Sequence, residues 1–230
     1  MKHVLVTGGA RRIGRAISLM VAANGGMPVI HCNESVDEAE RLKNEIAASG
    51  GEARVVRADL SRTETMDALF DEILSKTGGR LDAIVNNASL YAPTGQGAAC
   101  RSIHVLSPLA LIRRLAAMGD GKAVVNILDT RVRDDAHAEY MAAKNELRDL
   151  TISLARELAP AVRVCGVAAG AVLQEDGHPV SELERLAAFN PLHAHGTPEG
   201  LAECVRFLLE TDFMTGEIIH YDGGYHLGKG

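Results

Sequence analysis

The sequence predicts a single α/β domain in which helices cover both faces of one doubly wound parallel sheet, giving three layers. Two observations carry this prediction. Short, nearly all-apolar segments alternate along the chain with longer segments whose apolar residues recur at helical spacing, which is the pattern of repeated strand–helix–strand units. A glycine-rich turn at residues 7–14 also lies directly between the first apolar segment and the first helical one.

The strand and helix segments follow one another in regular order. Each crossover between parallel strands should be right-handed, which places helices on both faces of the sheet. No change of composition marks a linker, so residues 1–230 are expected to form one domain. Strands are expected at Lys2–Val6, Pro28–His31, Ala53–Arg57, Ala83–Val85, Ala123–Leu128, Arg163–Val167 and Glu217–His220. Helices are expected at Arg12–Ala23, Val36–Ala48, Thr63–Leu74, Ile103–Met118, His137–Leu158 and Pro198–Leu209.

The least regular stretches are residues 91–101, 131–136 and 174–191, which hold three of the seven prolines. In a doubly wound sheet, such loops lie beyond the carboxyl ends of the strands, where ligands bind. The stretch 174–191 is expected to be a short substrate loop.

Composition excludes several classes of function. Hydrophobic side chains make up 47% of the 230 residues, enough for one substantial core. The net charge of −6 disfavours nucleic-acid binding, and no apolar run is long enough to span a membrane. Glycines interrupt the first apolar run too early for a signal peptide. The four cysteines lack metal-site spacing. We therefore expect a cytoplasmic protein with reduced cysteines and no metal, membrane or nucleic-acid partner.

The turn Thr7-Gly8-Gly9-Ala10-Arg11-Arg12-Ile13-Gly14 is a candidate phosphate site. Glycines let the backbone approach a pyrophosphate closely, and the N–H groups and positive end of the following helix hold the anion. The order of strand, glycine loop and helix is typical of a Rossmann dinucleotide-binding domain. For this segment alone, a plain strand-to-helix turn is the alternative.

Further motifs follow in order over nearly the whole chain: Ala58-Asp59-Leu60, Asn86-Asn87-Ala88-Ser89, and Tyr140 with Lys144 four positions later. Together with the glycine loop they resemble the short-chain dehydrogenase/reductase family, although Arg12 stands where the family has its middle glycine. The resemblance implies a nicotinamide-dependent oxidoreductase. The cofactor-binding residues that it implies are Gly8, Arg11, Arg12, Ile13, Gly14, Asn33, Ser35, Asp59, Leu60, Asn87, Ala88, Ser89, Tyr140, Lys144, Gly170 and Val172.

The spacing of Tyr140 and Lys144 carries a mechanism. Residues four positions apart lie on one face of a helix, so both side chains are expected to reach a common site. The pKa of a free tyrosine is about 10, too high for ready proton exchange near neutrality. A neighbouring ammonium favours the phenolate and is expected to lower that pKa. The resemblance implies that Tyr140 exchanges the proton while Lys144 holds the nicotinamide ribose.

The fifth strand ends in Asp129, where the family usually has a catalytic serine. With the basic Arg12 and the aromatic Tyr91, this replacement resembles the pteridine and dihydromonapterin reductases of the family, and it implies NADPH-dependent reduction of a dihydropterin. A pterin presents an amino group and ring nitrogens that suit a carboxylate, and its flat ring packs on an aromatic side chain. The implied catalytic residues are Asp129, Tyr140 and Lys144, and the implied substrate residues are Arg12, Ser89, Tyr91, Asp129 and Tyr140.

Two residues of this interpretation have alternatives. Thr130 is a candidate for the missing hydroxyl, which would leave Asp129 as a turn residue. His104 stands where the family has a helix asparagine that supports a water relay to the lysine. A histidine packed in the core is the other interpretation of that position.

The cofactor and the substrate class also have alternatives. Ser35 and the arginines of the glycine loop favour NADP, the expected cofactor, whereas Glu34 suits the ribose hydroxyls of NAD. The rival activity is reduction of another carbonyl, such as a 3-oxoacyl thioester or a sugar ketone. A non-catalytic dinucleotide-binding regulator is a further alternative. The resemblance also implies a homo-oligomer, a dimer or tetramer built on helices 103–118 and 137–158.

Overall fold

The computed structural model describes residues 2–91, 94–131, 135–173 and 180–228. Within these ranges, seven strands form one parallel sheet in the order β3-β2-β1-β4-β5-β6-β7. The chain winds outward from β1 to β3 and then returns to the other side of β1, which confirms the doubly wound sheet. The strands are β1 (His3–Val6), β2 (Met27–Cys32), β3 (Arg54–Arg57), β4 (Ala83–Asn86), β5 (Lys122–Asp129), β6 (Val162–Ala169) and β7 (Ile218–Tyr221).

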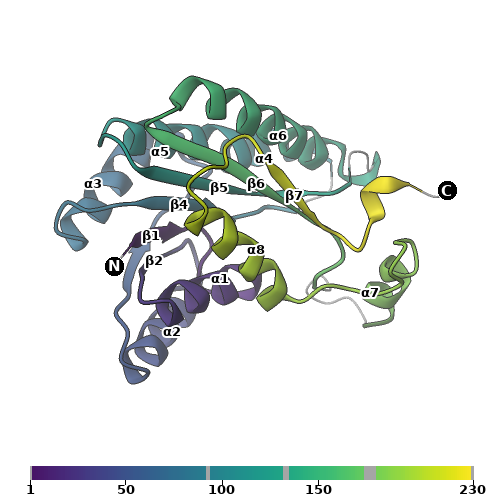
Figure 1. Cartoon of the computed structure of the whole chain (residues 1–230), viewed down its shortest axis with the longest axis horizontal. Coiled ribbons are helices and arrows are strands. Elements are labelled where there is room, and N and C mark those ends of the chain that lie inside the picture. The colour runs from purple at the N-terminus through teal and green to yellow at the C-terminus, as the bar shows by residue number, and fades with distance from the viewer. Residues whose placement is uncertain (1, 92–93, 132–134, 174–179, 229–230) are drawn as a thin grey trace.

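Helices cover both faces of this sheet, as Figure 1 shows. On one face lie α1 (Arg12–Ala23), α2 (Val36–Ala48) and α8 (Pro198–Glu210). On the other lie α3 (Met66–Lys76), α5 (Ser107–Ala116) and α6 (Ala138–Leu158). The predicted three-layer architecture is therefore confirmed.

Alternate residues of each central strand enter opposite layers of the core. On β5, Val125 and Ile127 pack with α1 and α8, whereas Val124 packs with α3 and α5. Successive side chains of a strand point to opposite faces, so a strand covered on both faces must be apolar throughout. This explains why β2, with the sequence MPVIHC, is buried at every position.

Two predicted loops contain helix. Within residues 91–101, α4 (Gly97–Arg101) begins a helix that continues through a π-helical turn, η2 (Ser102–Leu106), into α5. Within residues 174–191, α7 (Val180–Ala187) follows the segment 174–179, which lies outside the described residues. Short 3₁₀ turns are η1 (Thr63–Thr65), η3 (Asp135–His137) and η4 (Tyr225–Leu227).

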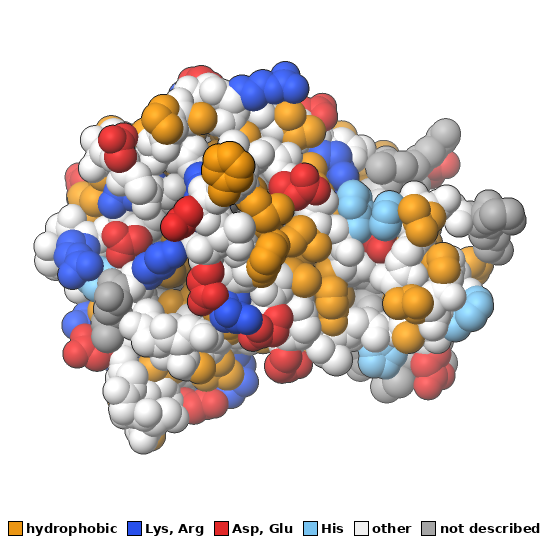
Figure 2. Space-filling view, in the orientation of Figure 1, with side chains coloured by type: hydrophobic (Ala, Val, Ile, Leu, Met, Phe, Trp, Pro, Cys, Tyr) orange, Lys and Arg blue, Asp and Glu red, His pale blue; other side chains and the backbone are white. Residues whose placement is uncertain are grey.

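The cysteines lie in separate parts of the core. Cys32 packs under α2, Cys100 lies on α4, and Cys165 lies on β6 and packs in the same cluster as α8, all of them buried. Cys204 on α8 is partly exposed. Figure 2 shows hydrophobic side chains gathered over α8 and β7, where Phe207 is 47% exposed. Among the described residues, no helix combines the length and apolarity needed to cross a bilayer.

Candidate active site

A cavity of about 840 Å³ opens at the carboxyl ends of β1, β4, β5 and β6, where the strand order reverses. The glycine loop, the ends of β4 and β5, which form its floor, and Leu183 and Leu186 of α7 line this cavity. The predicted site residues that line this cavity are Gly8, Arg11, Arg12, Ile13, Gly14, Ser35, Asn87, Ala88, Ser89, Tyr91, Asp129, Tyr140, Lys144, Gly170 and Val172.

The backbone of the glycine loop is closely packed, with Gly14 against Gly8. Gly8 has a φ of +61°, and a Cβ at Gly14 would lie 2.1 Å from the carbonyl oxygen of Gly8. Helix α1 begins without a side-chain cap, so its first N–H groups face the mouth of the loop. This backbone forms an anion site of the kind that holds a pyrophosphate. Arg12, in the place of the family's middle glycine, has a φ of +54°.

The end of β4 fastens this loop in place. Thr7 Oγ1 accepts hydrogen bonds from the backbone nitrogens of Asn87 (2.9 Å) and Ala88 (3.0 Å). The Asn87 amide nitrogen donates to the carbonyl oxygens of Thr7 (2.8 Å) and Gly8 (3.2 Å). The small residues of this motif therefore position the phosphate loop as well as line the cavity.

His31 is a part of the site that sequence reasoning missed. The backbone nitrogen of Gly8 donates to its Nδ1 at 3.1 Å, and its Nε2 donates to the carbonyl oxygen of Ala58 at 3.1 Å. Burial lowers the pKa of His31 to about 4, which keeps the ring neutral and able to accept at Nδ1. The only signal in the sequence is a histidine inside an otherwise apolar strand.

Three predicted cofactor residues lie outside the main cavity. Asp59 accepts hydrogen bonds from the nitrogen and hydroxyl of Ser61, which lower its pKa, and Leu60 is buried against α3. Asn33 lines a smaller hollow of about 230 Å³ beside the glycine loop, together with Glu34 and Ser35. Glu34 is exposed to solvent.

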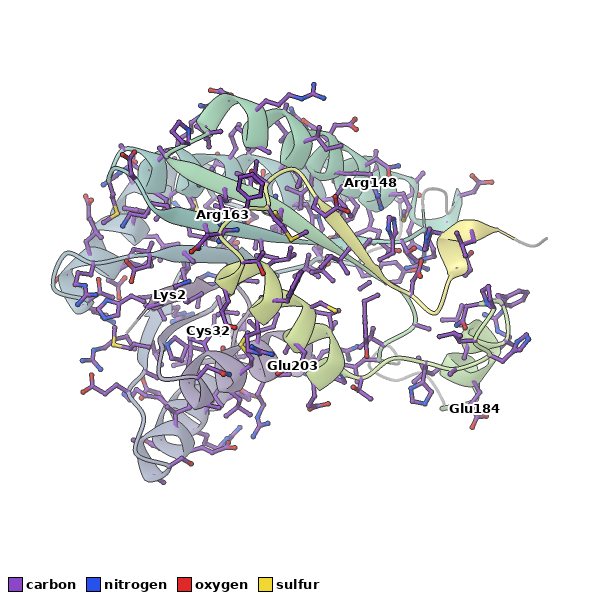
Figure 3. All side chains as sticks on the ribbon, in the orientation of Figure 1. Lys2, Cys32, Arg148, Arg163, Glu184 and Glu203 are labelled. Carbon is purple, nitrogen blue, oxygen red and sulfur yellow. The ribbon has the colours of Figure 1, made fainter. Side chains whose placement is uncertain are left out.

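Asp129 and Tyr140 meet on the cavity floor. The Tyr140 hydroxyl donates to Asp129 Oδ2 at 3.1 Å. Arg131, which sequence reasoning missed, donates from Nε to Oδ1 (3.2 Å) and from Nη2 to Oδ2 (2.9 Å) of the same carboxylate. Tyr91 lies edge-on to the Tyr140 ring at 4.9 Å. The guanidinium of Arg148, labelled in Figure 3, donates to the carbonyl oxygen of Asp129 and fixes the end of β5.

The pKa of Tyr140 corrects the expectation from the sequence. Burial raises that pKa well above 10, and the negative charge of Asp129 raises it further, although Arg131 acts in the opposite direction. Lys144 shares the helix face as predicted, with Nζ 5.7 Å from the Tyr140 ring centre. The carboxylate is the nearer charge, so the expected phenolate does not form and the phenol stays protonated.

Lys144 is buried and donates from Nζ to the carbonyl oxygen of Ile127 at 2.8 Å. Burial lowers its pKa to about 8, against the opposing effect of Asp129. The lysine is therefore mostly charged at neutral pH and loses its charge in mildly alkaline solution.

The alternative catalytic hydroxyl, Thr130, is committed elsewhere. It is buried, and its hydroxyl donates to Asp222 Oδ2 beside the 3₁₀ turn after β7. The same carboxylate accepts from the nitrogen and ring of His226 (both 2.9 Å). Because the one hydroxyl hydrogen of Thr130 is used, the hydrogen-bond pattern argues against a proton-donating Thr130.

His104 lies in the π-helical turn η2 and is completely buried. Its Nδ1 lies 2.9 Å from the carbonyl oxygen of Cys100, and its Nε2 lies 3.0 Å from the hydroxyl of Ser89 at the cavity wall. It is thus both packed in the core and joined to a predicted site residue.

A phosphate loop and a tyrosine–lysine pair at the switch point of a doubly wound sheet define a short-chain oxidoreductase. The chain belongs to the short-chain dehydrogenase/reductase family, and the family model described as enoyl-(acyl carrier protein) reductase matches residues 8–226.

Particular relatives narrow the comparison. The chain is similar to the crystal structure of FolM alternative dihydrofolate reductase 1 from Brucella canis complexed with NADP, with 34% identity, a TM-score of 0.93, and coverage of 100% of this chain and 95% of that one. An uncharacterized oxidoreductase from Methylorubrum extorquens is 32% identical, covering 97% of both chains. A 3-oxoacyl-[acyl-carrier-protein] reductase from Synechocystis is 31% identical, covering 96% of this chain and 95% of that protein.

Proposed function

We propose that this chain catalyses the NADPH-dependent reduction of a dihydropterin. The observation that carries the proposal is the carboxylate of Asp129, which accepts a hydrogen bond from the Tyr140 hydroxyl where the family has a serine. The similarity to an alternative dihydrofolate reductase complexed with NADP supports the same substrate class and cofactor.

The glycine loop fits a dinucleotide, because it lines the cavity and keeps a turn so tight that a Cβ at Gly14 would clash with the Gly8 backbone. The backbone from Gly8 to Gly14 would hold the pyrophosphate, and Lys144 would hold the nicotinamide ribose. When bound, NADPH supplies a hydride to the substrate carbon. Ser35 and Arg11 line the smaller hollow where a 2′-phosphate would lie. Glu34 also lines this hollow and is exposed to solvent. This favours NADPH over NADH.

Asp129 already binds a forked nitrogen donor. The guanidinium of Arg131 donates one N–H to each oxygen of the carboxylate. The amino-pyrimidine edge of a pterin presents two coplanar N–H donors in the same way, so it can take the place of the guanidinium. A ketone offers no such donor to a carboxylate.

Tyr140 is the proposed proton donor. Reduction of a ring C=N bond adds a hydride to carbon and a proton to nitrogen, while NADPH becomes NADP⁺. The raised pKa of Tyr140 keeps its proton in place until the substrate nitrogen gains charge. Asp129 orients the hydroxyl by accepting its hydrogen bond, and the phenol regains its proton from solvent after turnover.

The test is NADPH oxidation, followed by absorbance, with a panel of dihydropterins, 3-oxoacyl thioesters and sugar ketones. We expect turnover of dihydropterin and a loss of about 10²–10⁴-fold in kcat for Tyr140→Phe and Asp129→Asn, the range for removing an acid–base group. Glu146→Gln, on the same helix as Tyr140, changes only a surface ion pair with Arg101 of α4 and should retain activity. Full pterin reductase activity in Tyr140→Phe would contradict the proposal.

The panel also separates the alternatives. Preference for a 3-oxoacyl thioester would favour the activity of the acyl-carrier-protein relatives. Tight NADPH binding without turnover of any substrate would favour a regulator. We propose further that residues 1–230 act as one domain, in the cytoplasm, as a dimer or tetramer without nucleic acid. Sedimentation of the purified chain tests the assembly.

A further inference from the structure

The π-helical turn η2 brings a buried histidine ring to the wall of the cavity. His104 has three neighbours within hydrogen-bond distance: the Cys100 carbonyl oxygen (2.9 Å from Nδ1), the Ser89 hydroxyl (3.0 Å from Nε2) and the Leu90 backbone nitrogen (3.2 Å from Nε2). Its ring also lies edge-on to Tyr140, with centres 5.3 Å apart. Single π-helical turns occur frequently at functional sites.

These neighbours determine which ring nitrogen carries the proton. A carbonyl oxygen only accepts, so Nδ1 must donate to Cys100. A backbone N–H only donates, so Nε2 must accept from Leu90. The ring is neutral because burial and the nearby charge of Lys144 lower its pKa to about 3. His104 is therefore held as the tautomer with a proton on Nδ1 and none on Nε2.

This tautomer fixes the role of Ser89. Since Nε2 has no hydrogen to give, the Ser89 hydroxyl must donate its single hydrogen to His104. Ser89 lines the cavity beside the Tyr140 hydroxyl, with which it interacts. A hydrogen given to His104 leaves the Ser89 oxygen with lone pairs to offer a ligand. Together with Asp129, it gives the wall around Tyr140 two hydrogen-bond acceptors.

We propose that His104 is a positioning residue that fixes Ser89 as a hydrogen-bond acceptor, so that the site favours substrates with an N–H donor beside the bond being reduced. The substrate half of this proposal rests on the proposed function. The ring N–H and amino groups of a dihydropterin meet this requirement. A simple ketone does not, because it has no N–H for these two acceptors and can use only the Tyr140 hydroxyl as a donor.

The tautomer is tested directly by nuclear magnetic resonance on the whole protein with isotope-labelled histidine. His104→Phe identifies the signal of His104 by its disappearance. We expect the ring nitrogen shifts of a neutral imidazole protonated on Nδ1 at neutral pH. A proton found on Nε2, or a charged ring, would overturn the proposal whether or not any substrate is reduced.

A double-mutant cycle tests the action through Ser89. In His104→Phe, the aromatic volume remains but the acceptor is lost, so the Ser89 hydrogen is free to turn toward the ligand. We expect KM for dihydropterin to rise about tenfold, the effect of about one hydrogen bond. In a Ser89→Ala background, the same change should raise KM less than about twofold. His104→Gln, whose side-chain oxygen can reach the Nε2 position, should recover most of the loss.

The controls distinguish the two proposals. NADPH affinity, measured by nicotinamide fluorescence, should be unchanged in the His104 single variants, since His104 contacts no part of the phosphate loop in the described residues. Equal KM effects of His104→Phe with and without Ser89 would show a merely structural role and overturn the inference. Absence of dihydropterin turnover in the wild type would count against the proposed function, and the tautomer measurement then decides the assignment of His104.

Discussion

Arg12 holds a left-handed backbone conformation, with a φ of +54°, at the position where the family has glycine. A side chain in this region costs about 1–2 kcal/mol, so the guanidinium is present despite a strained backbone. The same residue lines the cavity beside Tyr91 and Ser89. Strain of this kind persists where the side chain has a function, and we propose that Arg12 acts on the phosphates or the pterin.

We expect Arg12→Gly to raise stability by about 1 kcal/mol, because the relief of strain exceeds the effect of the greater freedom of the unfolded chain. Arg12→Ala keeps the strain and should gain nothing. Both variants should raise KM for dihydropterin or NADPH. Urea unfolding with steady-state kinetics measures both effects. Equal stability changes in the two variants would contradict the strain argument.

The buried charge of Lys144 makes the stability of the folded chain depend on pH. Its pKa is lowered from 10.5 in the unfolded chain to about 8 in the folded one. Between these values, only the unfolded chain keeps the proton, so the stability of the wild type should rise with pH. Relative to Lys144→Met, the gain over this window should be about 3 kcal/mol. Urea unfolding of both proteins from neutral pH to about pH 10 measures it, and a constant difference would exclude the lowered pKa.

At the scale of elements, a buried chain of polar side chains joins the sheet to the catalytic helix. The Asn86 amide on β4 donates to Asn126 Oδ1 on β5 (2.8 Å), and the Asn126 amide donates to Thr151 Oγ1 on α6 (2.9 Å). Thr151 in turn donates to the carbonyl oxygen of Leu147. Because α6 carries Tyr140 and Lys144, this chain fixes the helix against the cavity floor.

Thr151→Val keeps the shape of the side chain but leaves the Asn126 amide without its acceptor. We expect a loss of about 1–3 kcal/mol, the cost of one unpaired buried polar group. Ser153→Ala, on the exposed side of the same helix, should change stability by less than about 0.5 kcal/mol. Denaturant unfolding compares the two, and similar values would show that the buried chain contributes little.

The local pattern of apolar residues in the sequence was enough to predict where most helices and strands lie. Helices α1 and α2 begin and end at the predicted residues, because their apolar spacing and flanking turns are encoded locally. The π-helical turn was missed, since a single turn at Ser102–Leu106 is too short to show a period of its own in the sequence. The pairing of Gly8 with His31, and of Thr130 with Asp222, joins residues distant in sequence and has no local signal. The prediction of a lowered pKa for Tyr140 was wrong because burial raises that pKa and the nearby charge of Asp129 raises it further.

For the molecule as a whole, cofactor binding should appear as thermal stability. NADPH at a hundred times its Kd stabilises the folded state by about 2.7 kcal/mol, which corresponds to a rise in Tm of about 5–10 °C for a chain of this size. Gly14→Ala should abolish the rise, because the new methyl group would lie 2.1 Å from the Gly8 oxygen.

The control is Gly50→Ala, at a glycine with a φ of +83° and open space around it, far from the phosphate loop. This variant should lose stability, since alanine is strained there, yet keep the full NADPH response. Differential scanning calorimetry with and without cofactor distinguishes the two. A normal response in Gly14→Ala would contradict the role assigned to the loop.

The distribution of the cysteines has a practical consequence. Cys32, Cys100 and Cys165 each belong to a different hydrophobic cluster, and burial raises the pKa of all three thiols. Alkylation requires an accessible thiolate, so each of these sulfurs reacts only when its own cluster opens. Mass spectrometry of the labelled peptides would therefore give a separate opening rate for each of three regions of the native enzyme, without any engineered probe.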